Sequence, residues 1–187
     1  VSKVIALLGI TASMVITVAS GSSGPVMAFG WAWIAFSMWP VRRQMRLIRW
    51  CLSIGVITLH LVMKAPVWFL IGRMSVFDGS TGFFRAYLID STIKNFGDWW
   101  LLGTESTAAW GRGLFDVTNE YISQGVSGGL LTMVLFILII SRSFGTIGKT
   151  VHRLEVKPLE VKLGVWALGA ALLAHVTTYF SVSYFDQ

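Results

Sequence analysis

Long uncharged apolar runs alternate with short basic segments along this chain, and one polar stretch interrupts them. Between Lys3 and Arg42 no residue is charged, and the turn formers at 21–25 divide this stretch into two runs. A helix needs about 17–25 apolar residues to cross a bilayer. The pattern therefore predicts about five membrane-spanning helices, at residues 4–20, 26–41, 47–63, 126–141 and 163–182.

The polar stretch at about 64–125 is expected to form one long loop outside the membrane, because it holds six of the nine acidic residues. Apolar side chains recur at helical spacing from Thr81 to Asn95, which predicts a helix lying along the membrane surface. A second short helix is predicted over Phe115 to Ile122. Three indoles are expected at headgroup depth, those of Trp99, Trp100 and Trp110.

Composition supports a membrane protein. The 187 residues are 55% hydrophobic and 13% charged, with a mean hydropathy of +0.69, whereas a soluble domain carries roughly 25% charged residues. The predicted fold class is an all-α polytopic membrane helix bundle in which residues 1–187 form one membrane domain. The single Cys51 lies in an apolar run, which predicts a small buried side chain, no disulfide and no thiolate metal site.

The basic residues predict how the helices are oriented. The net charge of +6 is concentrated in short segments, at about 42–46 and 142–162, so it indicates membrane topology and not a nucleic-acid partner. Both segments are expected to be cytoplasmic, which places the loop at 64–125 on the periplasmic or extracellular side. The chain begins at Val1 without an initiator Met and stops at Gln187 after an apolar run, so we expect part of a longer protein with further helices before it.

The predicted outer loop combines arginines, tyrosines, tryptophans and carboxylates next to lipid. Arginine provides a planar fork for phosphate, and aromatic rings can stack on sugars. A carboxylate can accept the proton of an attacking hydroxyl. These residue types suit a substrate with a lipid tail, a phosphate and a sugar, although composition alone does not select it.

Four segments, in their order along the chain, resemble the carboxyl-terminal half of the O-antigen ligase and polymerase family of bacterial membrane proteins. Residues 20–25, Ser-Gly-Ser-Ser-Gly-Pro, look like that family's Thr/Ser-x-Ser-Arg-Gly turn, and residues 80–85 look like its segment leading to a loop arginine. Residues 100–104, Trp-Leu-Leu-Gly-Thr, look like its Pro-Leu-x-Gly-x-Gly turn. Residues 116–131 look like its His-Asn-x-Tyr-Leu segment and the Gly-Leu entry into a span that follows it.

The resemblance implies a GT-C-like glycosyltransferase of the bacterial cytoplasmic membrane that uses neither a metal nor another cofactor. Its donor would be an undecaprenyl-diphosphate-linked glycan and its acceptor the hydroxyl of a glycan or lipid, with membrane lipid around it. By position, Arg85 would bind the diphosphate and offset the charge of the leaving group. Whether such a protein is a ligase or a polymerase stays open.

Further site residues follow from the same resemblance. Asn119 and Tyr121 would orient the acceptor or the sugar. The loop also offers Arg73 and Arg112 for phosphate and Trp110 for sugar.

Two positions depart from the family pattern, because its turn arginine is Ser23 here and its histidine is Thr118. The nearest proton acceptors are then Asp116 and Glu120, which would share one face if this piece were helical. The chain would use one of these as its base, or would be a relative with different chemistry.

Two other functions remain open at this point. A transporter or channel subunit would use ionisable groups inside its spans, and His60 and His175 lie in apolar runs. That function predicts convergence of the two imidazoles at mid-membrane. A non-catalytic subunit of a polysaccharide assembly system is the other alternative, because the family's histidine is missing.

Overall fold

The protein is all-helical throughout the part of the chain that the structure describes. The computed structural model describes residues 3–21, 23–70, 79–180 and 182, and no strand occurs among them. Three helical segments are long and apolar enough to cross a membrane, namely Trp39–Val62, Glu120–Arg153 and Leu159–Thr178. The all-α fold predicted from the sequence is thus confirmed, and these three segments are compatible with the predicted membrane crossings.

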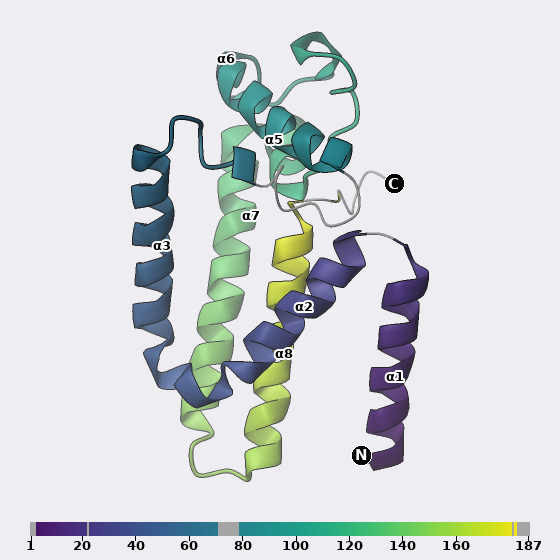
Figure 1. The fold of residues 1–187 in the computed structure, drawn as a ribbon. Coiled ribbons are helices and arrows are strands. Elements are labelled where there is room, and N and C mark those ends of the chain that lie inside the picture. Colours follow the sequence, from purple (N-terminus) through teal and green to yellow (C-terminus); the bar gives the residue numbers. More distant parts are fainter. Residues whose placement is uncertain (1–2, 22, 71–78, 181, 183–187) are drawn as a thin grey trace.

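Five apolar helices occupy the five runs that the sequence marks out (Figure 1). They are α1 (Lys3–Ala19), α2 (Ser23–Ser37), α3 (Met45–Val62), α7 (Glu120–Arg153) and α8 (Leu159–Thr178). The first two have 17 and 15 residues, which is short for a crossing. The predicted break between them is present, because α1 ends at Ala19 and Gly21 adopts a positive φ of 57°.

Two bounds differ from the expected ones. Helix α7 begins before the expected residue 126 and continues to Arg153, so much of the expected loop at 142–162 is helical. Helix α7 has 34 residues in all, and the part that follows its kink at Gly128 and Gly129 is about 36 Å long, compared with a hydrocarbon core of about 30 Å.

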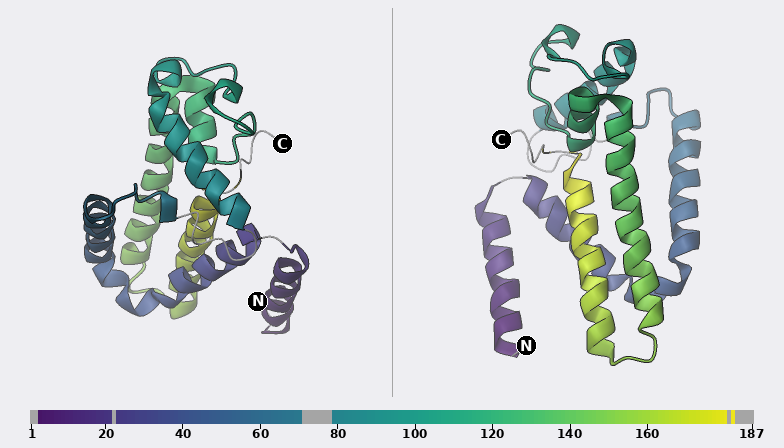
Figure 2. Two further views of the ribbon diagram at one scale, coloured as in Figure 1. Left: turned by 45° about the horizontal axis from the view of Figure 1, so that its top comes forward. Right: turned by 180° about the vertical axis from the view of Figure 1, so that it is seen from behind.

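Helix α2 lies obliquely across α8, and α7 runs alongside α8 in the opposite direction (Figures 1 and 2). The Trp166 indole N–H of α8 donates to the carbonyls of Ala35 and Phe36, at 3.0 and 3.2 Å. These carbonyls lie in the last turn of α2, where a helix leaves acceptors without partners. The indole therefore holds the end of α2 against α8.

Helices α1 and α3 stand at the margins of the bundle (Figures 1 and 2). No residue of α3 is buried, and its leucines, isoleucines and valines are largely exposed. Cys51 is also exposed, so its predicted burial is wrong. An apolar helix without protein neighbours on most of its surface is expected to contact lipid or further helices.

The two basic segments meet at one end of the bundle. The 3₁₀ helix η1 (Trp39–Gln44) and the connection between α7 and α8 lie together at the bottom of Figure 1. An ion pair of 3.9 Å joins Arg43 Nη2 to Glu155 Oε1 across them. Positive charge is therefore concentrated at a single end.

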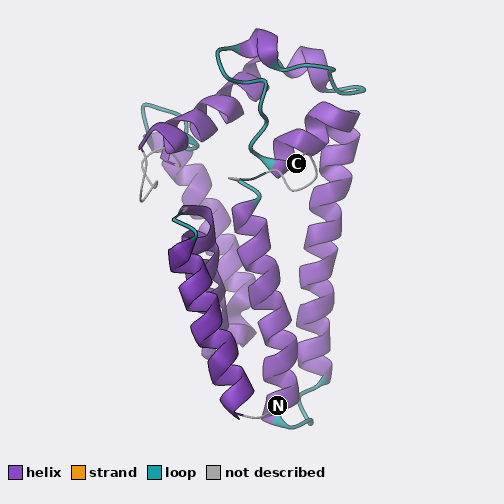
Figure 3. Cartoon of the chain, turned by 90° about the vertical axis from the view of Figure 1, so that its right-hand side faces the viewer, coloured by secondary structure: helices purple, strands orange, loops and turns teal. Residues whose placement is uncertain are grey.

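Residues 79–119, which we call the cap, cover the other end (Figure 3). They include α5 (Gly79–Lys94), α6 (Phe96–Trp99) and the 3₁₀ helix η2 (Ala108–Trp110). The bounds of α5 match those of the helix predicted from Thr81 to Asn95 closely, and its Lys94 pairs with Asp90 at 2.7 Å. Side chains of Leu88, Leu114 and Ile122 form the core that joins the cap to α7.

The second short helix predicted at 115–122 is wrong. Residues 111–116 form turns and a bend, and the chain is extended at Asn119, with φ −138° and ψ 115°. The Asn119 side chain accepts a hydrogen bond from the Ile122 N–H, so it caps α7 and fixes the helix start at Glu120. Asp116 therefore precedes the helix and does not share a helical face with Glu120.

Candidate functional site

Helix α7 is interrupted at a glycine pair close to the cap. Gly128 and Gly129 leave helical geometry, with φ, ψ of −144°, 18° and 77°, −179°. The Val126 carbonyl and the Leu130 N–H would bond to each other in a regular helix, and the kink separates them. In an apolar layer each such group needs another partner.

The turn from Trp100 to Thr104 supplies both partners. The Thr104 N–H donates to the Val126 carbonyl at 2.7 Å, and the Leu130 N–H donates to the Trp100 carbonyl at 2.8 Å. We call this pair of backbone bonds the clip. It fastens the cap to the kinked helix and leaves neither of these two groups unpaired.

Glycine is required on both sides of the clip. A Cβ on Gly129 would lie 2.7 Å from the Leu101 carbonyl carbon, and a Cβ on Gly103 would overlap the Val126 carbonyl oxygen. Both residues also have positive φ, at 77° and 87°. The Gly128–Gly129 and Gly103 positions are visible in the sequence, but the kink and the clip were not predicted from them.

Trp99 is buried beside the clip and does not lie at the surface as its predicted headgroup position required. Its ring packs on Gly125, where a Cβ would stand 2.8 Å from Cζ3, and its indole N–H donates to the Thr92 carbonyl at 2.9 Å. Trp100 is exposed. One of the neighbouring indoles thus packs inside the protein while the other faces outward.

Three predicted site residues join the start of α7 to the end of α8. The Asn119 side-chain amide donates to the Phe180 carbonyl at 3.5 Å, and the Glu120 N–H donates to the Tyr179 carbonyl at 2.9 Å. The Tyr121 hydroxyl donates to the Val176 carbonyl at 2.9 Å. One main-chain donor at the start of α7 and two side-chain donors beside it thereby bond to carbonyls at the end of α8, where a helix has no donors of its own for them.

Aromatic rings surround this junction. The ring of Tyr121 contacts Phe136 of its own helix and Tyr179 and Phe180 at the end of α8, with centroid separations of 4.8–6.0 Å. Phe136 and Tyr179 also contact each other at 5.6 Å. Tyr121 is therefore held by packing as well as by its hydrogen bond, which makes it a structural residue of the junction.

The two candidate bases have opposite environments. Glu120 has no exposed surface, and its Oε1 accepts a hydrogen bond from the Gln124 amide at 2.7 Å. Asp116 is exposed, in the bend that precedes Asn119. In this conformation only Asp116 can meet a substrate hydroxyl directly. Gln124, the partner of Glu120, was not singled out in the sequence.

Arg85 lies on α5 with its guanidinium half-buried in the cap. Its Nε is buried and has no hydrogen-bond partner among the described residues, and it forms no ion pair with them. Burial holds the pKa of Arg85 below its usual range. A partly buried cation without an anion among the described residues is costly, so this position favours an anionic ligand.

The hydrophobic core of the cap brings Arg85 and Asp116 onto one structural unit. Phe84, next to Arg85, packs against the Leu88, Leu114 and Ile122 core, and so does Val117, next to Asp116. The structure therefore joins the arginine helix to the segment that carries the predicted base. Thr118, where the resemblance predicts histidine, has a buried hydroxyl without a partner among the described residues.

The remaining predicted residues are not gathered around Arg85 by any contact that the structure shows. Trp110 is half-buried, packs against the core of the cap and donates from its indole to Asp98 at 3.1 Å. Arg112 is exposed in the turn after η2. Arg73 lies outside the described residues.

The two histidines of the transporter hypothesis both lie at helix ends. His60 is in the last turn of α3, where its Nδ1 accepts from the Val67 N–H at 3.3 Å. His175 is in the last turn of α8. Neither is at the middle of its helix. Among the residues that the structure describes, no group of three or more His, Cys, Asp or Glu could hold a metal ion.

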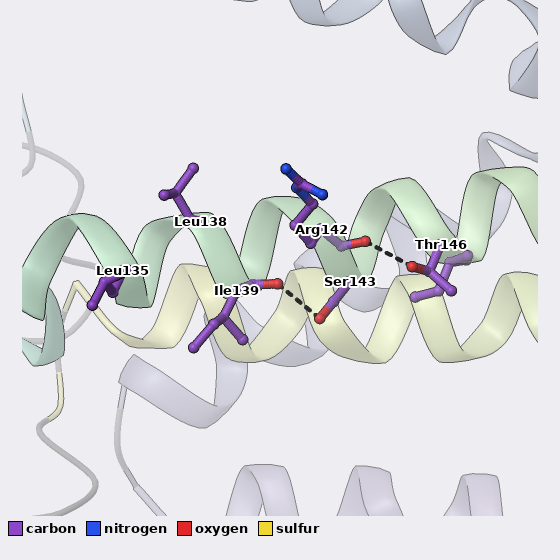
Figure 4. A pocket seen from close by; sticks show the side chains of 7 residues that line it. Leu135, Leu138, Ile139, Arg142, Ser143 and Thr146 are labelled. Atoms are coloured by element: carbon purple, nitrogen blue, oxygen red, sulfur yellow. Dashed lines mark hydrogen bonds between the residues drawn. The ribbon is translucent and has the colours of Figure 1, made fainter.

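A groove lies along α7 away from the cap (Figure 4). It has a volume of about 660 Å³ and is lined by Leu135, Leu138, Ile139, Arg142, Ser143, Thr146 and Ile147. None of the predicted site residues lines it. Comparisons of the chain with family models, with characterised proteins and with solved structures found no match.

Proposed function

We propose that this chain belongs to an enzyme that transfers or polymerises a glycan from an undecaprenyl-diphosphate carrier at the outer face of a bacterial cytoplasmic membrane. The half-buried guanidinium of Arg85, which has no anionic partner among the described residues, carries the proposal. A diphosphate would supply the missing anion and two acceptors for a planar fork. Charge that develops on the leaving diphosphate would be stabilised by the same cation.

The surface of the cap supports a lipid-linked substrate. Its exposed apolar side chains are those of Phe83, Ile93, Phe96, Trp100, Leu101, Leu102 and Phe115. Apolar and aromatic side chains in a polar loop suit the membrane interface, where a diphosphate headgroup also lies. In this proposal the five apolar helices cross the membrane, the basic end is cytoplasmic and the cap is periplasmic.

We assign the proton acceptor to Asp116 in preference to Glu120. An acceptor hydroxyl must come within about 2.6–3.2 Å of its base, and Glu120 has no exposed surface. Asn119 and Tyr121 support the reaction indirectly, because their polar groups bond to the end of α8. Their role is to position the segment that carries Asp116.

The test is in vitro transfer by the full-length protein in lipid, supplied with an undecaprenyl-diphosphate-linked glycan. Arg85→Ala should reduce transfer by about 10²–10³-fold, the usual effect of losing one electrostatic contact to the transition state. Arg85→Lys should retain part of the activity, because it keeps the charge and loses the fork. Lys94→Ala removes an exposed cation from the same helix and should leave transfer unchanged.

Asp116→Asn should reduce transfer by about 10²–10⁴-fold if this carboxylate is the general base. Undiminished transfer by a folded Arg85→Ala protein would reject the diphosphate site. Undiminished transfer by Asp116→Asn would reject the assigned base. If the wild-type protein transfers no glycan, the non-catalytic assembly subunit becomes the better description.

A further inference from the structure

The groove on α7 follows one stripe of the helix surface. Its lining residues recur at spacings of three and four from Leu135 to Ile147, so they share one face. This span of 12 steps covers about 18 Å, slightly more than one leaflet of a hydrocarbon core about 30 Å thick. Seven of these steps, about 10 Å, separate Leu135 from Arg142, so this part of the groove matches the stretch of one acyl chain that lies next to its headgroup.

Polarity changes part-way along the groove at Arg142, which lies between an apolar part and a part lined by Ser143, Thr146 and Ile147. Leu135, Leu138 and Ile139 form an apolar half, and Arg142 stands where the uncharged run of α7 ends. Leu138 and Arg142 extend from the same side of the helix in Figure 4. A ligand with an apolar chain and an anionic group would match both halves at once.

The two hydroxyl groups in the groove already donate hydrogen bonds to backbone carbonyls of α7. Ser143 Oγ donates to the Ile139 carbonyl at 2.9 Å, and Thr146 Oγ1 donates to the Arg142 carbonyl at 3.0 Å, as the dashed lines in Figure 4 show. Arg142 forms no ion pair among the residues that the structure describes. Its guanidinium is the group in this groove that is left to bind a ligand.

The surroundings of Arg142 are also positive. Its end of the bundle carries the two basic segments, with Lys149 and Arg153 on α7 itself and η1 alongside. Basic residues at the edge of an apolar layer attract anionic lipid headgroups, and each cation near the surface strengthens this attraction about fivefold. Charge complementarity thus selects an anionic lipid over a neutral one.

We propose that this groove binds one anionic phospholipid, with an acyl chain on Leu135, Leu138 and Ile139 and the phosphate on Arg142. Arginine suits the phosphate because its fork binds two oxygens at once. The inference requires α7 to cross a membrane and does not depend on glycan transfer. It is therefore tested separately from the proposed enzyme activity.

The test counts lipids that remain on the purified full-length protein by native mass spectrometry. The protein in detergent is titrated with phosphatidylglycerol or with phosphatidylcholine of identical acyl chains. The wild type should retain one phosphatidylglycerol in preference to phosphatidylcholine. Arg142→Gln should weaken that binding at least about tenfold, since it removes a charge-assisted hydrogen bond.

Arg153→Gln is the matched control. It makes the same charge change on the same helix, at an exposed position about 16 Å further along. It should weaken binding of phosphatidylglycerol at most about fivefold, the effect of one cation near the surface, and so less than Arg142→Gln does. Equal retention of the two lipids by the wild type, or unchanged retention by Arg142→Gln, would overturn the proposal.

A second measurement separates lipid from a protein occupant. A nitroxide is attached to Leu138→Cys in a Cys51→Ser background, in the full-length protein reconstituted in vesicles containing phosphatidylglycerol. A groove occupied by lipid leaves the label accessible to dissolved oxygen, which partitions into acyl chains. A label protected from oxygen would mean that another helix covers the groove, and would also overturn the proposal.

Discussion

Replacing Gly129 by alanine should open the clip between the cap and α7. The residue has φ 77° and ψ −179°, a region that side chains other than glycine adopt at a cost of about 1–3 kcal/mol. The new Cβ would also stand 2.7 Å from the Leu101 carbonyl carbon, so the Trp100–Thr104 turn must move away. This movement breaks the two clip bonds, at about 0.5–1.5 kcal/mol each.

The sum for Gly129→Ala is about 2–6 kcal/mol of lost local stability. Hydrogen exchange on the full-length protein in nanodiscs measures it, because the Thr104 and Leu130 amides are the two donors of the clip. Their exchange should become at least roughly 30-fold faster, which corresponds to the lower bound of that range.

Gly145→Ala is the control for this experiment. A Cβ at Gly145 would meet nothing within 4 Å, and the residue lies in a regular part of the same helix. Alanine there should be neutral or stabilise α7 by about 0.5–1 kcal/mol. If both variants fold and the Thr104 and Leu130 amides exchange equally fast in the two, the assignment of the clip is refuted.

Three further variants test other contacts. Trp99→Phe removes the indole bond to the Thr92 carbonyl and should lower the opening free energy of the cap by about 0.5–1.5 kcal/mol, read as faster exchange in α5. Trp166→Phe removes the contacts to the end of α2 and should speed exchange there while leaving the clip protected. In Asp90→Asn the pKa of Lys94 should return toward 10.5, because the hydrogen bond and charge of Asp90 raise it, and NMR titration of the lysine side chain measures this change. Since that pKa is raised in the folded protein, the contribution of the pair is present below the unfolded lysine pKa and is lost as pH rises through the folded value.

Charge and hydropathy predict the positions of the apolar helices well. A run without charge can be identified from composition alone, and the turn formers around Gly21 mark where α1 stops. Helix α5 was also predicted because Phe84 and Leu88 recur at helical spacing on the side that packs into the core of the cap. Such features depend on neighbours within about one helical turn.

The candidate site was harder to predict because its contacts are distant in sequence. Tyr121 bonds to a carbonyl 55 residues further along, and Asn119 bonds to one that is 61 residues away. No local pattern carries that information. The predicted helix at 115–122 failed for a different reason, since spacing alone does not show that Asn119 is extended and caps the next helix.

For Arg85, the sequence predicted the position of the residue but not its environment. Its position in the loop was predicted from the resemblance, whereas the buried nitrogen that makes it a candidate anion site follows only from packing in the cap. The burial of Glu120 was not predicted either. An acidic residue in a polar loop is expected to be exposed, whereas Glu120 has no exposed surface in the structure. Burial of polar groups therefore has to be read from the structure.

The clip consists of main-chain groups alone, so the sequence around it can change during evolution without breaking it. Its two hydrogen bonds join the Thr104 N–H, the Trp100 carbonyl and two groups of α7, so the side chains at most of these positions are free to change. Only the glycines at 103 and 129 are constrained by space and by φ. Relatives that keep these two glycines at the same separation should retain the clip, even where the surrounding residues have diverged too far to be aligned.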